Sequence, residues 1–449
     1  MVLIVKAVGV LNRTALRAVI CGCAAFLPGP AIAQSADRAD IERGAYLARA
    51  GDCVACHTAG PQAPLFAGGV ALNSPFGLIY SANITPDPVN GIGRYSLDDF
   101  SRAVREGVDK EGSRLYPAMP YPSFAKMTDE DIRALYAYFI NEVKPVDYQP
   151  PETKLPFPFN IRWDLMFWDA LFVKNERYKP RDDHDAQWNR GAYLVQSLGH
   201  CGTCHTPRGF AFQEKAYTES SPLYLKGAVL DNWFASNLTG DFASGLGRWS
   251  EADIAAFLAT GHNGQSAASG SMIEVVENSS QYLHEDDLDA IAHYLKSLPA
   301  HDEQASYKPD RPDVAATLSA MVTGEVERPG AGLYQSFCVK CHKETGEGEA
   351  GKFPKLAGNS NVLSKNVTSL IHLLLEGSKT ARTKAGPKPR EMPAFAGKFT
   401  DRQIADVLSF IRTSWGNAAA RVTPREVSLL RDALQNKAIR PNAKPADKR

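Results

Sequence analysis

The 449-residue chain lacks three features that would each point to a different class of protein. Its 50 basic residues balance 50 acidic ones, so nothing indicates the concentrated basic surface that nucleic-acid binding needs. No apolar run reaches the roughly 20 residues of a membrane-spanning helix. No glycine-rich fingerprint follows a predicted strand, so no dinucleotide-binding domain is predicted.

Acidic residues are also absent from the first 33 residues, which carry Lys6, Arg13 and Arg17. An apolar run over 18–27 follows, and an Ala-x-Ala triplet closes the segment at 31–33. This order is typical of an export signal, so we expect residues 1–33 to be removed and the mature chain to start near Gln34 in the periplasm. The alternatives are an uncleaved anchor, for which the run is too short, and an acylated lipoprotein, which the cysteine pattern fits poorly. Without these residues the formal net charge is −3.

Cysteine is scarce, with eight in the chain and two of these in the predicted signal. The other six fall into three copies of C-x-x-C-H, the attachment pattern of haem c. The copies are Cys53, Cys56 and His57; Cys201, Cys204 and His205; and Cys338, Cys341 and His342. On a helical turn, residues three apart share a face, so both thiols can add to the vinyl groups of one porphyrin while the histidine reaches its iron.

Three other interpretations of the cysteines fit less well. A structural zinc site needs two converging C-x-x-C pairs and does not require a histidine after each. A thioredoxin-like redox pair would give one motif in a βαβ setting rather than three in helical surroundings. Disulfides suit an exported protein, but cysteines separated by two residues are poor cross-links. We therefore predict three haem c groups.

Each motif lies in a repeated frame of sequence. The segment 43–47 recurs at 190–194 and more loosely at 330–334, and the segment 83–96 recurs at 237–250. Such repetition indicates duplicated domains. Helix signals close each unit, among them a cap from Thr128 to Asp131, a stop at Pro299 and a capping box from Thr400 to Gln403. Strand alternation is scarce, so the predicted fold class is all-α, with three tandem class I cytochrome c-like domains.

The predicted domains are joined by two linkers and followed by a tail. The boundaries are 1–33 for the signal, 38–148 for the first domain, 149–180 for a Pro-rich and apolar segment, 181–300 for the second domain, 301–328 for a charged linker, 329–420 for the third domain and 421–449 for the tail.

Two segments outside the domains are candidates for contact with a membrane or a partner. In the first linker an apolar helical face is predicted to pack between domains or to rest on a partner or bilayer surface. That face comprises Ile161, Leu165, Trp168 and Phe172, with Trp163, Met166 and Phe167 nearby. In the tail, Thr423 and Glu426 form a capping box around Pro424, and the basic end beyond it either favours anionic lipid or is simply solvated.

An electron-transfer haem needs a second strong axial ligand, most often methionine or histidine. One methionine lies late in each predicted unit, at a similar distance past its motif histidine, and these are the predicted ligands: Met119, Met272 and Met392. Prolines flank two of them and limit the cost of ordering the loop. Met127 competes with Met119, but it precedes the Thr128 cap and is expected to pack under that helix. His262 is the main alternative to Met272.

The motif histidine also needs a partner for its other ring nitrogen. Proline carbonyls are the predicted acceptors in two units, at Pro64 after the first motif and at Pro354 after the third. The second unit has no proline at the matching position, so its acceptor is left open.

Longer segments of the chain resemble a known family. They are 83–139 with its Gly91-Ile92-Gly93 and 115–122 stretches, 199–208, 275–279 and 409–417. On these motifs the chain resembles the three-haem cytochrome c subunits of bacterial membrane-bound dehydrogenases that oxidise alcohols, gluconate, sorbitol or glucose. The resemblance implies a partner subunit carrying PQQ or FAD, an acceptor such as ubiquinone or a terminal oxidase, and peripheral association with the periplasmic side of the cytoplasmic membrane.

The predicted function is therefore electron transfer, with no catalysis by this chain itself. A haem enzyme such as a peroxidase is the alternative from another class, but it needs an iron with an open or displaceable site, and each unit here supplies a methionine. A free soluble multihaem carrier is a third hypothesis. The chain length and the apolar helix between domains argue against it.

Overall fold

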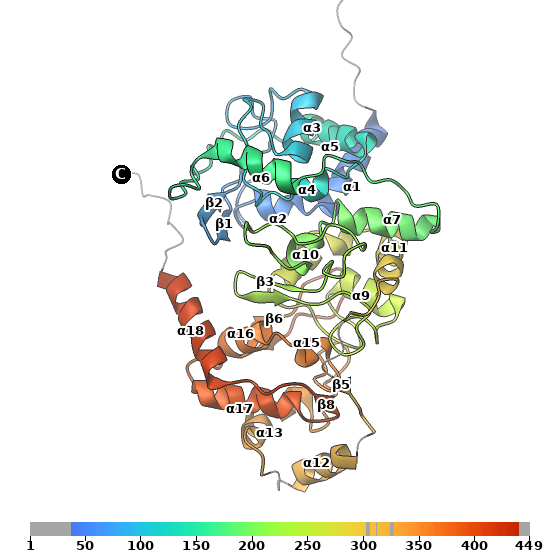
Figure 1. Ribbon diagram of the computed structural model, residues 1–449, viewed down its shortest axis with the longest axis vertical. Helices are drawn as coiled ribbons and strands as arrows, with labels where there is room; N and C mark the ends of the chain where they lie inside the picture. The colour runs from blue at the N-terminus through green and yellow to red at the C-terminus, as the bar shows by residue number, and fades with distance from the viewer. Residues whose placement is uncertain (1–36, 302–305, 311, 324–326, 440–449) are drawn as a thin grey trace, which may run out of the picture. The chain divides into compact units, whose positions relative to one another are not determined.

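The computed structural model describes residues 37–301, 306–310, 312–323 and 327–439. Within these ranges the chain forms short helices joined by long loops, with four two-stranded antiparallel sheets (Figure 1). The helix-rich character agrees with the predicted fold class. The predicted signal peptide and the basic end of the tail lie outside the described residues. None of the helices in these ranges has the length and apolar character needed to cross a membrane.

The segment around the first motif contains five helices and one hairpin. They are α1 (Arg38–Ala50), α2 (Cys53–His57), β1 (Ala71–Ser74), β2 (Gly77–Tyr80), α3 (Leu97–Glu106), α4 (Tyr121–Phe124) and α5 (Asp129–Asn141). The Thr128 side chain accepts from the Asp131 N–H and starts α5, as predicted. Helix α1 packs against α5.

The segment around the second motif repeats this order. It contains α7 (Ala186–Gln196), α8 (Gly202–His205), β3 (Ala228–Leu230), β4 (Trp233–Ala235), α9 (Glu251–Thr260), α10 (Ser271–Asn278), η2 (Ser280–Tyr282) and α11 (Glu285–Lys296). Helix α7 packs against α11 as α1 packs against α5. The capping box of Ser96 and Asp99 at α3 recurs as Ser250 and Asp253 at α9. The internal repeat in the sequence is therefore also a repeat in the structure.

The segment around the third motif is shorter before its first cysteine. It contains α13 (Ala331–Phe337), α14 (Val339–His342), α15 (Ser360–Leu363), α16 (Thr368–Glu376), β6 (Ser378–Lys379), β7 (Glu391–Met392), α17 (Asp401–Arg412), β8 (Asn417–Ala418) and α18 (Pro424–Ile439). The predicted capping boxes at Thr400 and Thr423 are both present.

Helix α18 begins at the predicted capping box, but it packs against the third segment, which the sequence did not predict. Its residues Val427, Leu430 and Leu434 are buried in the same core cluster as α16 and α17, against which the helix packs (Figure 1). The first turns of the tail therefore belong to the third segment, because their apolar spacing matches a helix face that the segment buries.

Two further pairs of elements lie in the linkers. They are η1 (Arg162–Asp164) with α6 (Leu165–Phe172), and β5 (Ser306–Tyr307) with α12 (Pro312–Thr323). Strand β5 pairs with β8, which ties the second linker to the third segment. Along η1 and α6 the predicted apolar face is half-buried, whereas Trp163 on η1 and Met166 and Phe167 on α6 are exposed. One side of α6 packs against the protein and the other faces outward.

In each segment a glycine in or next to the first helix meets the backbone of a later helix, which is α5, α11 or α17. A Cβ on Gly44 would lie 2.0 Å from the Ala134 carbonyl oxygen, and one on Gly191 would lie 1.9 Å from that of Ala290. Gly330, with φ +87°, meets the Asp406 carbonyl in the same way at 2.2 Å. The repeated glycines therefore allow helix backbones to touch where a side chain would separate them.

Ion pairs join the same helices. Arg43 on α1 donates to the buried Asp131 on α5 at 2.8 Å, and Arg190 on α7 donates to Asp287 on α11 at 2.7 Å. Each ion pair joins two helices of the same segment, and the two segments use equivalent residues for it.

Two tyrosines then cross between the segments. Tyr46 of the first segment donates its hydroxyl to Asp287 of the second, and Tyr193 of the second donates to Asp131 of the first. One core cluster runs through both segments, from Leu47 to Leu298, while a second surrounds the third motif. The first two segments are thus packed as a pair, in which a tyrosine of each donates to an aspartate of the other. The predicted domain boundary between them stays a prediction.

Candidate haem sites

All three C-x-x-C-H motifs fold as a single helical turn that begins within a few residues of the end of a longer helix. They form α2, α8 with Cys201 before it, and α14 with Cys338 before it. In the last two, the histidine N–H donates to the carbonyl of the first cysteine at 2.9 Å. The turn therefore places both sulfurs of a motif on one side, as expected for attachment to one porphyrin. The six cysteines form no disulfide.

The motif cysteines are partly exposed, yet the pKa of five of the six thiols lies above its ordinary value. Burial, helped by the charge of Asp52, raises the pKa of Cys53 to about 12 and that of Cys56 to about 11. Burial also raises the pKa of Cys201 and of Cys338 to about 12. Reactive C-x-x-C pairs need the opposite, a lowered thiol pKa in electropositive surroundings. The environment therefore disfavours the redox-pair interpretation.

Each motif histidine donates its Nδ1–H to a backbone carbonyl. The acceptors are Ala82 for His57 at 2.7 Å, Ser236 for His205 at 2.6 Å and Pro354 for His342 at 2.9 Å. This bond fixes the ring and leaves Nε2 available for iron. Burial also lowers the pKa of all three rings, which keeps them neutral as metal ligands must be.

The predicted proline carbonyl accepts from the histidine ring in the third site, at Pro354, but the prediction of Pro64 for the first site is wrong. The Pro64 carbonyl accepts from the Ala67 N–H within its own turn and does not reach His57. The true acceptors, Ala82 and Ser236, each directly precede a copy of the repeated Asn-x-Thr segment at 83–85 and 237–239. In both copies the asparagine side chain accepts the threonine N–H at 2.9 Å, which holds the preceding residue in place. This repeat was the signal that could have located the acceptors.

The loops that carry Met119 and Met272 have the same hydrogen-bond register. Four residues before each methionine, Leu115 or Ala268 donates its N–H to the carbonyl of the glycine that ends α3 or α9, at 2.7 and 2.8 Å. Both methionines are half-buried. The register makes them equivalent positions, and this supports the same role for both.

The two competing residues occupy other positions in the repeat. His262 pairs with Ala267 as Val108 pairs with Arg114, so His262 corresponds to a valine that cannot bind iron. Its ring is buried and Nε2 has no hydrogen-bond partner. Met127 lies in the core cluster beneath α5, the packing position predicted for it.

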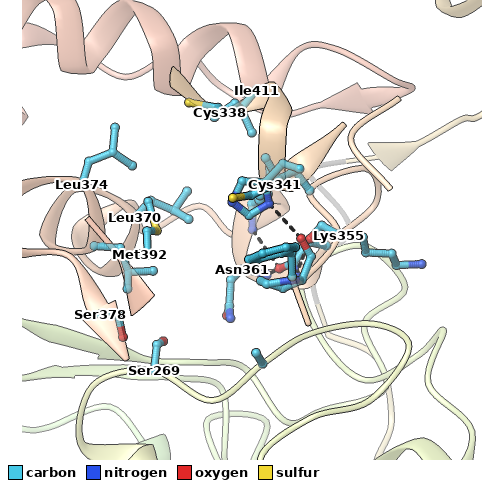
Figure 2. A pocket seen from close by; sticks show the side chains of 18 of the residues that line it. Ser269, Cys338, Cys341, Lys355, Asn361, Leu370, Leu374, Ser378, Met392 and Ile411 are labelled. Carbon is cyan, nitrogen blue, oxygen red and sulfur yellow. Dashed lines mark hydrogen bonds between the residues drawn. The ribbon is translucent and has the colours of Figure 1, made fainter. Parts of the chain in front are cut away.

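The third motif and its predicted methionine line one cavity. Cys338, Cys341, His342 and Met392 border a space of about 1300 Å³, counted out to its open mouth. Figure 2 shows Cys341 on one side of this space and Met392 on the other, with Leu370 and Leu374 beside the methionine. Two thiols, a histidine with Nε2 available, a thioether and apolar walls are the groups that a covalently bound haem requires. The residues present therefore fit that group.

The elements of neighbouring sites touch. Helix α2, which is the first motif, packs against α10, which carries Met272, and the Cys204 sulfur is close enough to Cys56 to influence its pKa. The cavity of the third motif is bordered on one side by residues 266–269 of the second segment, and Asn359 donates to the Gln265 carbonyl at 3.0 Å. The second site thus adjoins both the first and the third.

Comparisons with known proteins agree with this chemistry. The cytochrome c family model matches residues 328–415. The chain is 48% identical to the cytochrome c subunit of an alcohol dehydrogenase (quinone) of Gluconacetobacter polyoxogenes, over 91% of this chain and 88% of the relative. It is 46% identical to the gluconate 2-dehydrogenase cytochrome c subunit of Pantoea cypripedii, over 88% and 90%. It is 41% identical to the fructose dehydrogenase cytochrome subunit of Gluconobacter japonicus, over 90% and 84%.

Proposed function

The chain belongs to the family of cytochrome c subunits of alcohol, gluconate and fructose dehydrogenases, and we propose that it carries electrons from a PQQ- or FAD-dependent partner to ubiquinone or a terminal oxidase. Its proposed place is the periplasmic side of the cytoplasmic membrane, after removal of residues 1–33. The observation that carries the proposal is the threefold motif, in which each histidine ring is oriented by a backbone carbonyl.

The proposed sites each contain two cysteines for covalent attachment, one histidine and one methionine as axial ligands. They are Cys53, Cys56, His57 and Met119; Cys201, Cys204, His205 and Met272; and Cys338, Cys341, His342 and Met392. A haem held in this way supplies reversible one-electron chemistry. The role of the chain is to hold each histidine ring in one orientation and to surround the site with apolar side chains. A methionine at every site leaves no open position of the kind that a peroxidase uses.

We further propose that the second haem lies in the middle of the relay. The contact of α2 with α10, and of residues 266–269 with the third cavity, support short steps from the first site to the second and from the second to the third. On this path no electron has to pass directly from the first site to the third.

Substrate oxidation tests the proposed function directly. The purified holoprotein should stay oxidised with ethanol, gluconate, fructose, sorbitol or glucose, because those oxidations remove two electrons and need an organic cofactor that accepts the pair. Adding the cognate dehydrogenase with its substrate should reduce the haems, and a quinone analogue should reoxidise them. The absorbance of the reduced haem follows both steps. Reduction of the isolated chain by substrate would replace this proposal with a self-sufficient enzyme.

A further inference from the structure

Exposed apolar side chains concentrate on one short stretch of the chain. Six of the large apolar residues that the structure leaves exposed lie within 157–171: Phe157, Phe159, Trp163, Met166, Phe167 and Leu171. Leu171 is 75% exposed and Trp163 is 63% exposed. No other stretch of similar length in the described part of the chain exposes so many. A patch of this kind marks an interaction surface; we call it the outer face of α6.

The opposite side of α6 is anchored, so the outer face has a defined direction. The Asp169 carboxylate is buried and accepts from the Tyr121 hydroxyl at 2.7 Å and from Arg114 at 2.8 Å. The Trp168 indole N–H donates to the Ala211 carbonyl at 3.0 Å. These contacts tie the helix to both the first and the second segment. Met166, Phe167 and Leu171 are therefore exposed on a packed helix, while Phe157, Phe159 and Trp163 lie in the turns and in η1 just before it.

A basic pocket begins where α6 ends. Phe172, the last residue of α6, lines it, together with five basic and two acidic side chains: Lys126, Lys174, Arg177, Lys179 and Arg181, with Glu176 and Glu219. The two arginines have carboxylate partners within 4 Å, whereas in the part of the chain that the structure describes none lies that close to the three lysines. Since the whole chain has no net charge, this is a local concentration of positive charge.

Lys126 is the most buried of the three lysines. Its ammonium donates to the Gln196 side-chain oxygen at 2.9 Å and to the Tyr217 carbonyl at 2.6 Å, which leaves one of its three N–H donors. Burial lowers the pKa of Lys126 to about 8; the charges of Glu214 and Glu219 oppose this shift, and the charge of Lys174 adds to it. An anion in the pocket would stabilise the charged forms of both lysines.

We propose that the outer face of α6 and the basic pocket together seat the protein on an anionic bilayer, with the apolar side chains in the interfacial region and the lysines around a phospholipid phosphate. This rests on the proposed function, in which the acceptor is reached at the membrane. Aromatic and aliphatic side chains next to lysines are the composition of helices that lie in the membrane interface. A protein partner would use the apolar face equally well, but it would not explain a pocket at the end of α6 in which three lysines have no carboxylate of the described residues within 4 Å.

Co-sedimentation of the holoprotein with vesicles tests the proposal. Binding is expected with phosphatidylcholine vesicles that contain phosphatidylglycerol, and it should be much weaker with phosphatidylcholine alone. Lys174→Gln with Lys179→Gln should weaken binding to the anionic vesicles by about thirty-fold. Phe167→Ser with Leu171→Ser should weaken binding to both kinds of vesicle. Val89→Ser removes an apolar side chain that is 75% exposed and belongs neither to the outer face of α6 nor to the tail; it should change nothing, so it is the matched control.

Three results would overturn the proposal. The first is unchanged binding of either double variant to anionic vesicles. The second is no binding of the unaltered protein to these vesicles, even if inorganic phosphate occupies the pocket. The third is loss of the complex with the dehydrogenase in either double variant while vesicle binding persists, which would assign the face to that subunit. Haem reduction by the dehydrogenase in solution is measured on the same variants. It should be unchanged, which separates failure of this proposal from failure of the proposed function.

Discussion

Replacing Met392 with alanine is expected to convert one of three haems from low spin to high spin. The thioether lines the cavity of the third motif, and alanine cannot reach across to an iron held by His342. The weak sulfur-to-iron band near the red end of the oxidised spectrum should lose about a third of its intensity if the three sites contribute equally. Met119→Ala and Met272→Ala should each have the same effect at their own site.

Two variants serve as controls for these substitutions. Met127→Leu changes a buried methionine outside the proposed sites and should leave the spectrum intact. His262→Ala addresses the competing ligand of the second site. A spectrum that Met272→Ala leaves unchanged and His262→Ala alters would assign that ligand to the histidine instead.

Replacing Gly191 with alanine is expected to destabilise the protein by about 3 kcal/mol or more, at the upper end of what overpacking costs. The new Cβ would lie 1.9 Å from the Ala290 carbonyl oxygen and 2.8 Å from the Tyr294 Cβ, so α7 and α11 would have to separate. Separation would also strain the ion pair of Arg190 and Asp287 and the tyrosine that joins it from the first segment. Urea unfolding followed by circular dichroism measures the change.

Gly332→Ala is the matched control for this substitution. Gly332 lies in α13, and no atom is within 4 Å of the position its Cβ would take. Alanine there should be neutral or stabilise the helix by about 0.5–1 kcal/mol, since glycine is the poorer helix former. Equal free energies of unfolding for the two variants would contradict the close crossing of α7 and α11.

The features predicted best from the sequence were local ones. The caps at Thr128 and Thr400 depend on residues three apart in the chain, and the motif turns depend on five consecutive residues. The apolar face of α6 followed from helical spacing, which left open whether that face packs between domains or rests on a partner or bilayer surface. Spacing also did not show that the opposite side of the helix is exposed. That depends on where Tyr121 and Ala211 lie, and both are distant in sequence.

Contacts between segments were not predictable in the same way. The Tyr46 hydroxyl reaches Asp287, 241 residues later, and no local pattern encodes that distance. The acceptor of His57 was predicted wrongly because Pro64 was assumed to play the part that Pro354 plays in the third unit. The Pro64 carbonyl instead accepts a hydrogen bond within its own turn. The burial of α18 was missed because its apolar residues could not be matched to a partner surface before the third core was known.

The central claim is that each C-x-x-C-H motif of this chain holds one covalent haem. Mass spectrometry of the denatured mature protein tests it most directly, because a thioether-linked haem stays with the chain. The account predicts three haem additions on a polypeptide that starts near Gln34, and two additions in a variant with Cys338→Ala and Cys341→Ala. Two or fewer additions on the unaltered chain would contradict it.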